Sequence, residues 1–175
     1  CLFRLGEDAE VFLQREDGSV VSAIPYFPNG KGDPEELPCK HGGVIHDGVA
    51  VETNTQPASN LTEWIEFNTA VMENVRSRAA SHGLRLLFAP AAFFPKSELT
   101  HPEATEAGCS IDFNAWAFRV NKRPNMRDFA QNRYSGGHVH FGKGDLSPVL
   151  NENLDQRKEL VVQLFEVGVS IPSVI

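Results

Sequence analysis

The chain has 175 residues, 41% of them hydrophobic, which is enough to bury the core of one globular domain. Its formal net charge of −7 argues against a nucleic-acid partner, because phosphate backbones select basic surfaces. The sequence contains no apolar run of membrane-spanning length and opens with no signal segment, so no membrane partner is expected.

The three cysteines, Cys1, Cys39 and Cys109, are widely spaced and odd in number. They do not form a disulfide framework, so a reducing cytoplasm is the simpler setting. Cys39 and His41 have no second pair of ligands in the sequence with which to complete a zinc site.

The first predicted element is a hairpin over about residues 9–27, with the Asp-Gly turn signal at Asp17. Its first strand carries Asp8 and Glu10 on one face, because side chains alternate along a strand. Two carboxylates directed at one point repel each other unless a cation or a proton lies between them.

A loop rich in glycine, proline and charge follows over residues 28–43. Its Gly-Lys-Gly sequence brings Lys31 near phosphate in one interpretation and leaves it as an exposed loop lysine in the other. The next predicted strand covers about residues 49–54 and places Glu52 and Asn54 on one face, with valines and a threonine on the other.

A helix is predicted from an Asn60 or Thr62 cap to about His82, ended by Gly83. Its apolar residues keep helical spacing and predict a stripe packed on the core, with no role in binding a cofactor. That stripe consists of Leu61, Trp64, Ile65, Val71, Met72, Val75 and Ala79.

The second half of the chain has weaker local signals. A strand is predicted over residues 84–89, an irregular functional loop over 90–108 and another strand over 115–120. A short helix over about 126–132 is expected to lead into a histidine-bearing strand, and an amphipathic helix over about 151–169 to close the chain. These elements predict an α+β fold: a largely antiparallel sheet with helices on one face and the acidic side chains on the opposite, concave face.

The most informative stretch is the histidine strand, in which His138 and His140 share a face. Gly136 and Gly137 precede them and allow a backbone or a phosphate to approach closely, and Arg133 adds a charge suited to phosphate or carboxylate. Taken singly, each polar strand face is compatible with a solvated surface or with histidines that only make hydrogen bonds. Taken together, the polar faces favour a metal site built on a sheet.

Three segments in chain order resemble the motifs of phage-type carboxylate–amine ligases, also called type 2 amidoligases, in the glutamine synthetase-like superfamily. They are residues 6–13 (Gly-x-Asp-x-Glu-Val-Phe-Leu), 47–54 (Asp-Gly-x-x-x-Glu-x-Asn) and 133–142 (Arg-x-x-Gly-Gly-His-x-His-x-Gly). Residues 108–116 are also similar to that family, and the resemblance runs over about residues 6–172.

The resemblance implies a single glutamine synthetase-like catalytic domain over residues 1–175 that binds ATP and Mg²⁺, with Mn²⁺ as a substitute. The implied metal ligands are Asp8, Glu10, Glu52 and His138, and the implied catalytic residues are Arg133, His140 and Asn54. Lys31, Gly136 and Gly137 are the expected nucleotide-binding residues.

The implied reaction joins a carboxylate to an amine through an acyl phosphate, with a peptide, a protein or a cell-wall precursor as substrate at the level of the family. Relatives in the wider superfamily often form oligomers. Family members continue with a sheet segment that carries arginines, whereas this chain starts at Cys1 and stops at Ile175. We therefore expect a C-terminally incomplete fragment of a longer protein.

Two alternatives remain open at this stage. Two histidines and several acids can hold a metal that activates water, which would make the protein a metal-dependent hydrolase. The truncated end is compatible with a non-catalytic protein that retains the fold.

Overall fold

The computed structural model describes residues 3–105, 113–114, 116–122 and 130–143. The chain divides into two compact units, residues 1–108 with 125–144 and residues 109–124 with 145–175. The single catalytic domain expected from the sequence stays a prediction.

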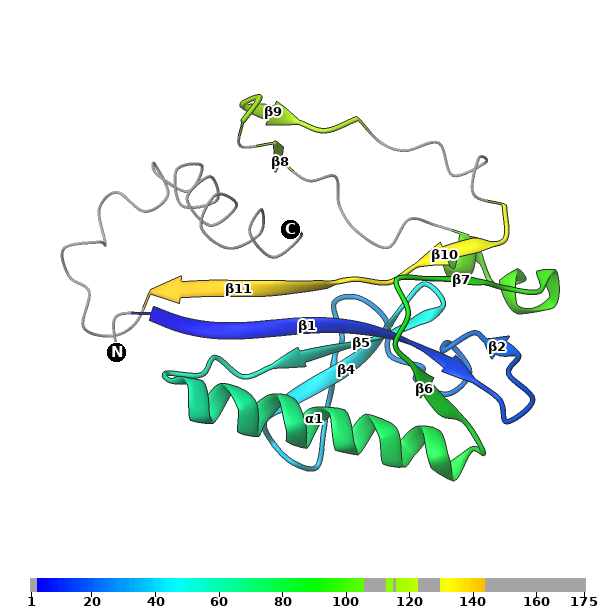
Figure 1. The fold of residues 1–175 in the computed structure, drawn as a ribbon, viewed down its shortest axis with the longest axis horizontal. Coiled ribbons are helices and arrows are strands. Elements are labelled where there is room, and N and C mark those ends of the chain that lie inside the picture. Colours follow the sequence, from blue (N-terminus) through cyan, green and yellow to red (C-terminus); the bar gives the residue numbers. More distant parts are fainter. Residues whose placement is uncertain (1–2, 106–112, 115, 123–129, 144–175) are drawn as a thin grey trace. The chain divides into compact units, whose positions relative to one another are not determined.

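The first unit is built on a long strand, β1 (Phe3–Gln14), at the centre of an antiparallel sheet (Figure 1). The strand order along the main path is β11-β1-β5-β4-β3. The bounds of the partner strands are β11 Gly137–Lys143, β5 Ala50–Thr55, β4 Gly42–Asp47 and β3 Glu35–Glu36. The fold is therefore mixed α+β with an antiparallel sheet, as the sequence predicted at this coarser level.

Two short strands extend the sheet at the far end of β1. β2 (Val20–Val21) and β6 (Arg85–Leu87) both pair with Leu13 and Gln14, so they lie along opposite edges of β1. The sequence-predicted hairpin is thus present, with its strands at residues 3–14 and 20–21. The strand predicted over 84–89 forms as β6.

Side-chain hydroxyls replace part of the ladder between β1 and β5. Thr53 Oγ1 accepts a hydrogen bond from Ala9 N (3.3 Å) and donates to Ala9 O (3.1 Å). Thr55 Oγ1 accepts from Glu7 N (2.9 Å) and donates to Glu7 O (3.3 Å). Each threonine therefore satisfies both backbone groups of one β1 residue.

Helix α1 (Leu61–Ser81) covers one face of this sheet (Figure 1). Asn60 is its N-cap and accepts from Glu63 N at 3.0 Å, and Gly83 follows the end of the helix at φ +70°. The predicted bounds of this helix are confirmed. Its side chains pack on the helix-side residues of the strands, in a core formed by Val11, Leu13, Val21, Ala23, Phe27, Leu37, Val44, Val51, Val71, Val75, Ala79 and Leu84.

The predicted apolar stripe of α1 is only partly buried. Val71, Val75 and Ala79 are buried, whereas Leu61 and Ile65 are exposed among the described residues. The difference lies along the helix: the buried residues all lie at or beyond the midpoint of α1, whereas Leu61 and Ile65 lie in its first two turns. A Cβ at Gly42 of β4 would lie 2.9 Å from Val71 Cγ2, so glycine is needed where helix and sheet meet.

A second, smaller core forms on the other face of the sheet. Phe12 and Phe94 pack edge to face with ring centroids 5.4 Å apart, beside Ala50 and Ala104. This core covers the end of β1 beyond Glu10. The acidic positions of β1 and β5 therefore lie next to this second hydrophobic core.

The segment between residues 90 and 105 contains more regular structure than the predicted irregular loop. It forms β7 (Ala91–Phe93), which pairs with β10 (Asn132–Tyr134), and two 3₁₀ helices, η1 (Lys96–Leu99) and η2 (Pro102–Thr105). These short elements close the far end of the first unit.

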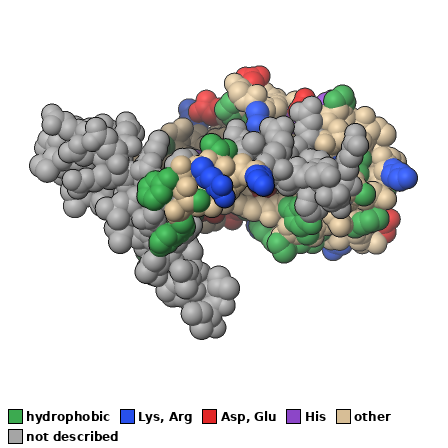
Figure 2. Space-filling view, turned by 90° about the horizontal axis from the view of Figure 1, so that it is seen from above, with side chains coloured by type: hydrophobic (Ala, Val, Ile, Leu, Met, Phe, Trp, Pro, Cys, Tyr) green, Lys and Arg blue, Asp and Glu red, His purple; other side chains and the backbone are tan. Residues whose placement is uncertain are grey.

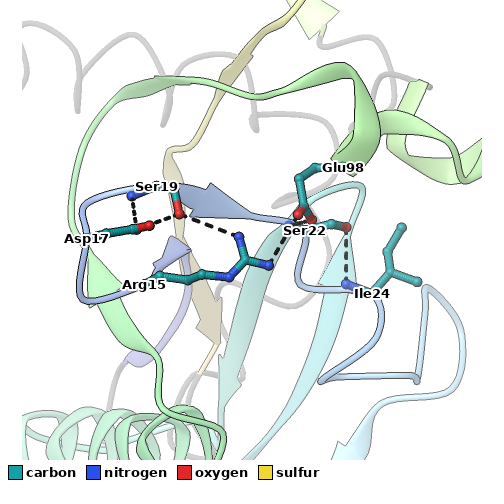
Figure 3. A network of polar contacts seen from close by, with 6 residues as sticks. All are labelled: Arg15, Asp17, Ser19, Ser22, Ile24 and Glu98. Atoms are coloured by element: carbon teal, nitrogen blue, oxygen red, sulfur yellow. Dashed lines mark hydrogen bonds and ion pairs between the residues drawn. The ribbon is translucent and has the colours of Figure 1, made fainter.

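Polar contacts tie the β1–β2 turn to η1 (Figure 3). Asp17 accepts from Ser19 N and Ser19 Oγ, which lowers the pKa of the Asp17 carboxyl. Glu98 of η1 accepts from Ser22 N at 2.9 Å and pairs with Arg15 at 3.5 Å. These contacts explain how the hairpin is held without a long β2.

In the second unit the described residues form a small hairpin in place of the single strand predicted over 115–120. β8 (Phe113–Asn114) pairs with β9 (Arg119–Val120). Asn114 Oδ1 accepts from Trp116 N and Ala117 N, an Asx-type turn that reverses the chain inside the expected strand. The predicted helix over 151–169, and residues 126–129 of the predicted short helix, lie outside the described residues.

Hydrophobic, basic and acidic side chains are interspersed on the described surface that Figure 2 shows. Among the described residues, no helix combines the length and apolar character needed to cross a bilayer.

Candidate functional site

Strand register places the acidic and imidazole side chains on one face of the sheet. Asp8 lies opposite His138 on the β1–β11 ladder, and Glu10 lies opposite Glu52 on the β1–β5 ladder. Because alternate residues share a face, this face is the one opposite α1. All four sequence-predicted metal ligands therefore lie on the same side of the sheet.

The tightest group on this face consists of Glu10, Asp47 and Glu52, which we call the acid cluster. One carboxylate oxygen from each residue lies within 4.8 Å of the others. Asp47 reaches the group because β4 and β5 form a two-residue hairpin, in which Asp47 pairs with Ala50 and Ile45 with Glu52. Gly48 supplies the positive φ of +56° that this turn requires.

The acid cluster is electrostatically strained. Burial, followed by the charge of Asp47, raises the pKa of Glu52 to about 7, and Asp8 and Glu10 act in the same direction. The ammonium group of Lys31 opposes this shift and lies 3.1 Å from Asp47 Oδ2. The site thus holds more negative charge than Lys31 neutralises, which is the condition that favours a bound cation.

Contacts to β4 hold the Lys31 loop against the cluster. His46 N donates to Asn29 O at 2.8 Å, and the His46 ring bonds through Nδ1 to Phe27 O and through Nε2 to Glu103, both at 2.7 Å. The hydrogen bond from His46 lowers the pKa of Glu103. His46 is buried and neighbours Asp47, so it positions the loop and does not face the cluster.

A second polar group lies along β11. His140 Nε2 is 2.7 Å from Asp8 Oδ2, and the His140 ring centroid is 6.4 Å from that of His138. The four predicted metal ligands are therefore not one cluster. Glu10 and Glu52 join Asp47, while Asp8 engages His140.

The glycine pair ahead of the histidines serves Glu10. Gly136 N donates to Glu10 Oε2 at 2.8 Å, and Gly136 O accepts from Glu10 N at 3.0 Å. A Cβ at Gly137 would lie 3.2 Å from Asp8 O, so the close approach here is to the backbone of β1. These contacts fix the Glu10 carboxylate beside the acid cluster.

Arg133 and Asn54, both predicted to be catalytic, make structural contacts. The Arg133 guanidinium donates to the carbonyls of Ala104, Ala130 and Asn132 at 2.8–3.2 Å, and burial lowers its pKa. Asn54 Oδ1 accepts from Gly43 N at 3.0 Å across the β4–β5 ladder. The structure brings neither side chain to the acid cluster by a hydrogen bond.

The donor set of the acid cluster fits a hard divalent cation. Oxygens bound on opposite sides of one ion lie about 4.2 Å apart for Mg²⁺ and about 4.6–5.2 Å apart for Ca²⁺, from their usual bond lengths. The three carboxylate oxygens lie within 4.8 Å of one another. Because three ligands cannot all be opposite one another, at least two of the three pairs must come closer by side-chain rotation to bind one ion. Three carboxylates without a sulfur ligand favour Mg²⁺ or Mn²⁺ over zinc.

Two hollows flank the site. One, of about 370 Å³, lies by β1 and β11 and is lined by residues that include Arg4, Gly6 and His140. The other, of about 540 Å³, lies between β1 and α1 and reaches Glu10 and Gly136. Both are large enough for part of an organic substrate.

Asp47 is the member of the acid cluster that the sequence analysis did not name as a ligand. Its signal lies in Gly48, because glycine at the first loop position of a two-residue hairpin suits a type II′ turn and leaves Asp47 as the last residue of its strand. Pairing Asp47 with Ala50 would have placed it diagonal to Glu52 on the same face.

Comparisons with protein-family models, with curated proteins and with solved structures found no match to this chain.

Proposed function

We propose that this chain is an ATP-dependent carboxylate–amine ligase with a glutamine synthetase-like catalytic fold. The observation that carries the proposal is the acid cluster of Glu10, Asp47 and Glu52, on the sheet face that also bears the Asp8–His140 pair. Its supports are this geometry and the resemblance of three sequence segments to phage-type amidoligases.

The acid cluster would hold one divalent cation, and Asp8 with His138 would supply ligands for a second. When bound, Mg²⁺ and ATP would supply charge neutralisation and a transferable phosphoryl group, so that the carboxylate is activated as an acyl phosphate. Lys31, which pairs with Asp47, would bind phosphate oxygens at the same site.

Asp8 orients His140 by accepting from its Nε2, which leaves Nδ1 for a substrate group. The 370 Å³ hollow beside His140 also contains Arg4, so two basic side chains line it. We assign this hollow to the substrate carboxylate, because a guanidinium and an imidazole both donate to anions.

The same proposal extends to the substrates, the cellular setting and the assembly of the protein. The substrates would be peptides, proteins or cell-wall precursors, the setting phage-related and cytoplasmic, and the assembly an oligomer. Cys39, a free thiol in the described part of the chain, is compatible with a reducing setting.

Calorimetry with the protein tests the proposal. A non-hydrolysable ATP analogue should bind in the presence of Mg²⁺ and bind at least tenfold more weakly without it. Glu52→Gln should remove the effect of Mg²⁺, whereas Glu36→Gln, an exposed acid on β3, should not. Binding that is equal with and without Mg²⁺ in the wild-type protein would rule out the proposed site.

The hydrolase is the alternative that one observation favours, since a carboxylate-bound histidine such as His140 can act as a general base. The two functions differ in their need for nucleotide. The ligase should release ADP and phosphate only with metal, a carboxylate and an amine all present. Metal-dependent amide hydrolysis without ATP would replace the ligase by the hydrolase.

A further inference from the structure

The ammonium group of Lys31 supplies positive charge to the acid cluster. Its Nζ lies 3.1 Å from Asp47 Oδ2. The Asp47 side chain is only 6% exposed, whereas the Lys31 side chain is 49% exposed, so the lysine reaches inward from solvent to a buried carboxylate. Burial raises the pKa of the Glu52 carboxyl, and the charge of Lys31 opposes that rise. Lys31 therefore acts on the cluster as a counter-ion that belongs to the chain itself.

The loop that carries Lys31 is fixed at its base on β4. His46 N donates to Asn29 O at 2.8 Å, and Asn29 Nδ2 donates to Asp33 O at 3.1 Å. Gly30 lies against the His46 ring, since a Cβ at this position would come within 3.2 Å of His46 Nε2. The backbone at Lys31 therefore stays in place when the lysine side chain changes its partner.

The tip of the loop leaves the Lys31 side chain room to move. Gly32 has a φ of +90°, and a Cβ there would meet no described atom within 4 Å. Lysine carries its ammonium on a flexible four-carbon stem. The ammonium can therefore leave Asp47 by side-chain rotation alone.

A divalent cation in the acid cluster would weaken the attraction that holds this ion pair. The three carboxylates, when ionised, carry three negative charges, and a bound divalent ion leaves a net charge of one. The ion also brings two positive charges close to the Lys31 ammonium, which repel it strongly at short range in a partly buried site. Lys31 then interacts more favourably with an anionic ligand of the metal than with Asp47.

We propose that Lys31 is the resident counter-ion of the acid cluster, and that a divalent cation displaces it from Asp47 and so frees its ammonium for a phosphate of the nucleotide. The inference rests on the proposed function and adds an order of binding, in which the cation precedes the nucleotide. The metal and Lys31 exchange places at Asp47, so the nucleotide meets a free ammonium only once the cation is bound.

Acylation of lysine amines, measured residue by residue with mass spectrometry, tests this exchange without turnover. An ammonium held in an ion pair reacts slowly, because only the neutral amine is a nucleophile. Mn²⁺ should raise the acylation rate of Lys31 about fivefold, the change that corresponds to an ion pair of about 1 kcal/mol. Adenylyl imidodiphosphate, a non-hydrolysable ATP analogue, should then lower the rate again. Lys96, an exposed lysine on η1, is the reference in the same sample and should not respond.

Two variants separate the ion pair from the metal site. Asp47→Asn removes the carboxylate that holds Lys31, so without metal Lys31 should already react at the rate that the wild-type protein reaches with Mn²⁺. Glu52→Gln keeps the pair between Lys31 and Asp47 and loses one metal ligand. Lys31 in that variant should react slowly with and without Mn²⁺.

The outcomes distinguish the exchange from the metal site. If Mn²⁺ raises the midpoint of thermal unfolding but leaves the Lys31 rate unchanged, the exchange is wrong and the proposed metal site stands. If Mn²⁺ changes neither quantity, the metal site is wrong and the exchange with it. Acceleration by Mn²⁺ that the nucleotide analogue does not reverse would overturn the assignment of Lys31 to phosphate.

Discussion

Glu10 and Glu52 lie directly opposite each other across the β1–β5 ladder, and their carboxylates belong to one cluster with Asp47. Like charges at opposed positions destabilise a sheet. Repulsion between these carboxylates therefore reduces the stability of the folded protein, and a bound proton or cation reduces that repulsion. The first three predictions follow from this repulsion.

Glu52 should make the protein less stable as the pH rises. Its folded-state pKa of about 7 lies above the ordinary value of 4.5, so the folded protein binds more protons than the unfolded chain between these values. Without metal, the free energy of unfolding should fall by about 1–2 kcal/mol between pH 4.5 and pH 8, after a discount for solvent screening. Urea unfolding at several pH values measures this fall.

Glu52→Gln is the matched variant for that titration. It should be more stable than the wild-type protein at pH 8 and should lose most of the fall with pH. A fall of equal size in Glu52→Gln would assign the titration to another group.

Glu10→Gln should abolish divalent-cation binding without harming the fold. The amide oxygen can still accept from Gly136 N, while one of three charges leaves the cluster. The midpoint of thermal unfolding without metal should be unchanged or higher, and Mn²⁺ should no longer raise it. Glu10→Ala should lose the same metal response. A large drop in the metal-free midpoint of Glu10→Gln would show that Glu10 is structural.

Lys31→Ala should tighten metal binding and raise the pKa of Glu52 further. The ammonium of Lys31 lowers that pKa and competes with a cation for Asp47, so its removal increases the negative potential of the cluster. Calorimetric titration with Mn²⁺ should show a lower Kd than in the wild-type protein. Lys96→Ala, on the exposed helix η1, serves as the control for a general change in charge. A weaker Mn²⁺ affinity in Lys31→Ala would mean that Lys31 mainly orients Asp47.

Asn60→Ala should reduce the free energy of unfolding by about 1 kcal/mol, the usual cost of losing an N-cap. The Asn60 side chain accepts from Glu63 N, and Glu63 in turn accepts from Ser59 N at 2.8 Å. Chemical denaturation measures the loss. Asn60→Ser should restore most of it, since a hydroxyl can also cap the helix; failure of both variants to differ from wild type would show that the cap contributes nothing.

Local chemistry made helix α1 predictable. The Asn60 cap, the helical apolar spacing and Gly83 all act within a few residues, and the predicted bounds matched the structure. The exposure of Leu61 and Ile65 was not predictable in this way, because it depends on which part of α1 lies over the strands.

Strand parity also predicted that the acids and histidines share a face, since it needs only the alternation of one strand at a time. Which of these side chains contact one another could not be predicted in this way, because it depends on the register between strands. His140 meets Asp8 because Gly6 pairs with His140 and Asp8 with His138, a relation between residues about 130 positions apart. Asp47 joined the cluster through a hairpin pairing, and the carbonyls that engage Arg133 come from η2 and the turn before β10.

The threonine hydroxyls between β1 and β5 give two amides an unusual kind of protection. The N–H groups of Glu7 and Ala9 are bonded to Thr55 and Thr53 side chains, which can rotate without any separation of the strands. In deuterium oxide these two amides should therefore exchange earlier than that of Val11, whose ladder neighbour is the backbone of Val51. At the centre of the sheet, deuterium would thus enter first at the amides beside the acidic residues, while the hydrophobic core stays protected from exchange.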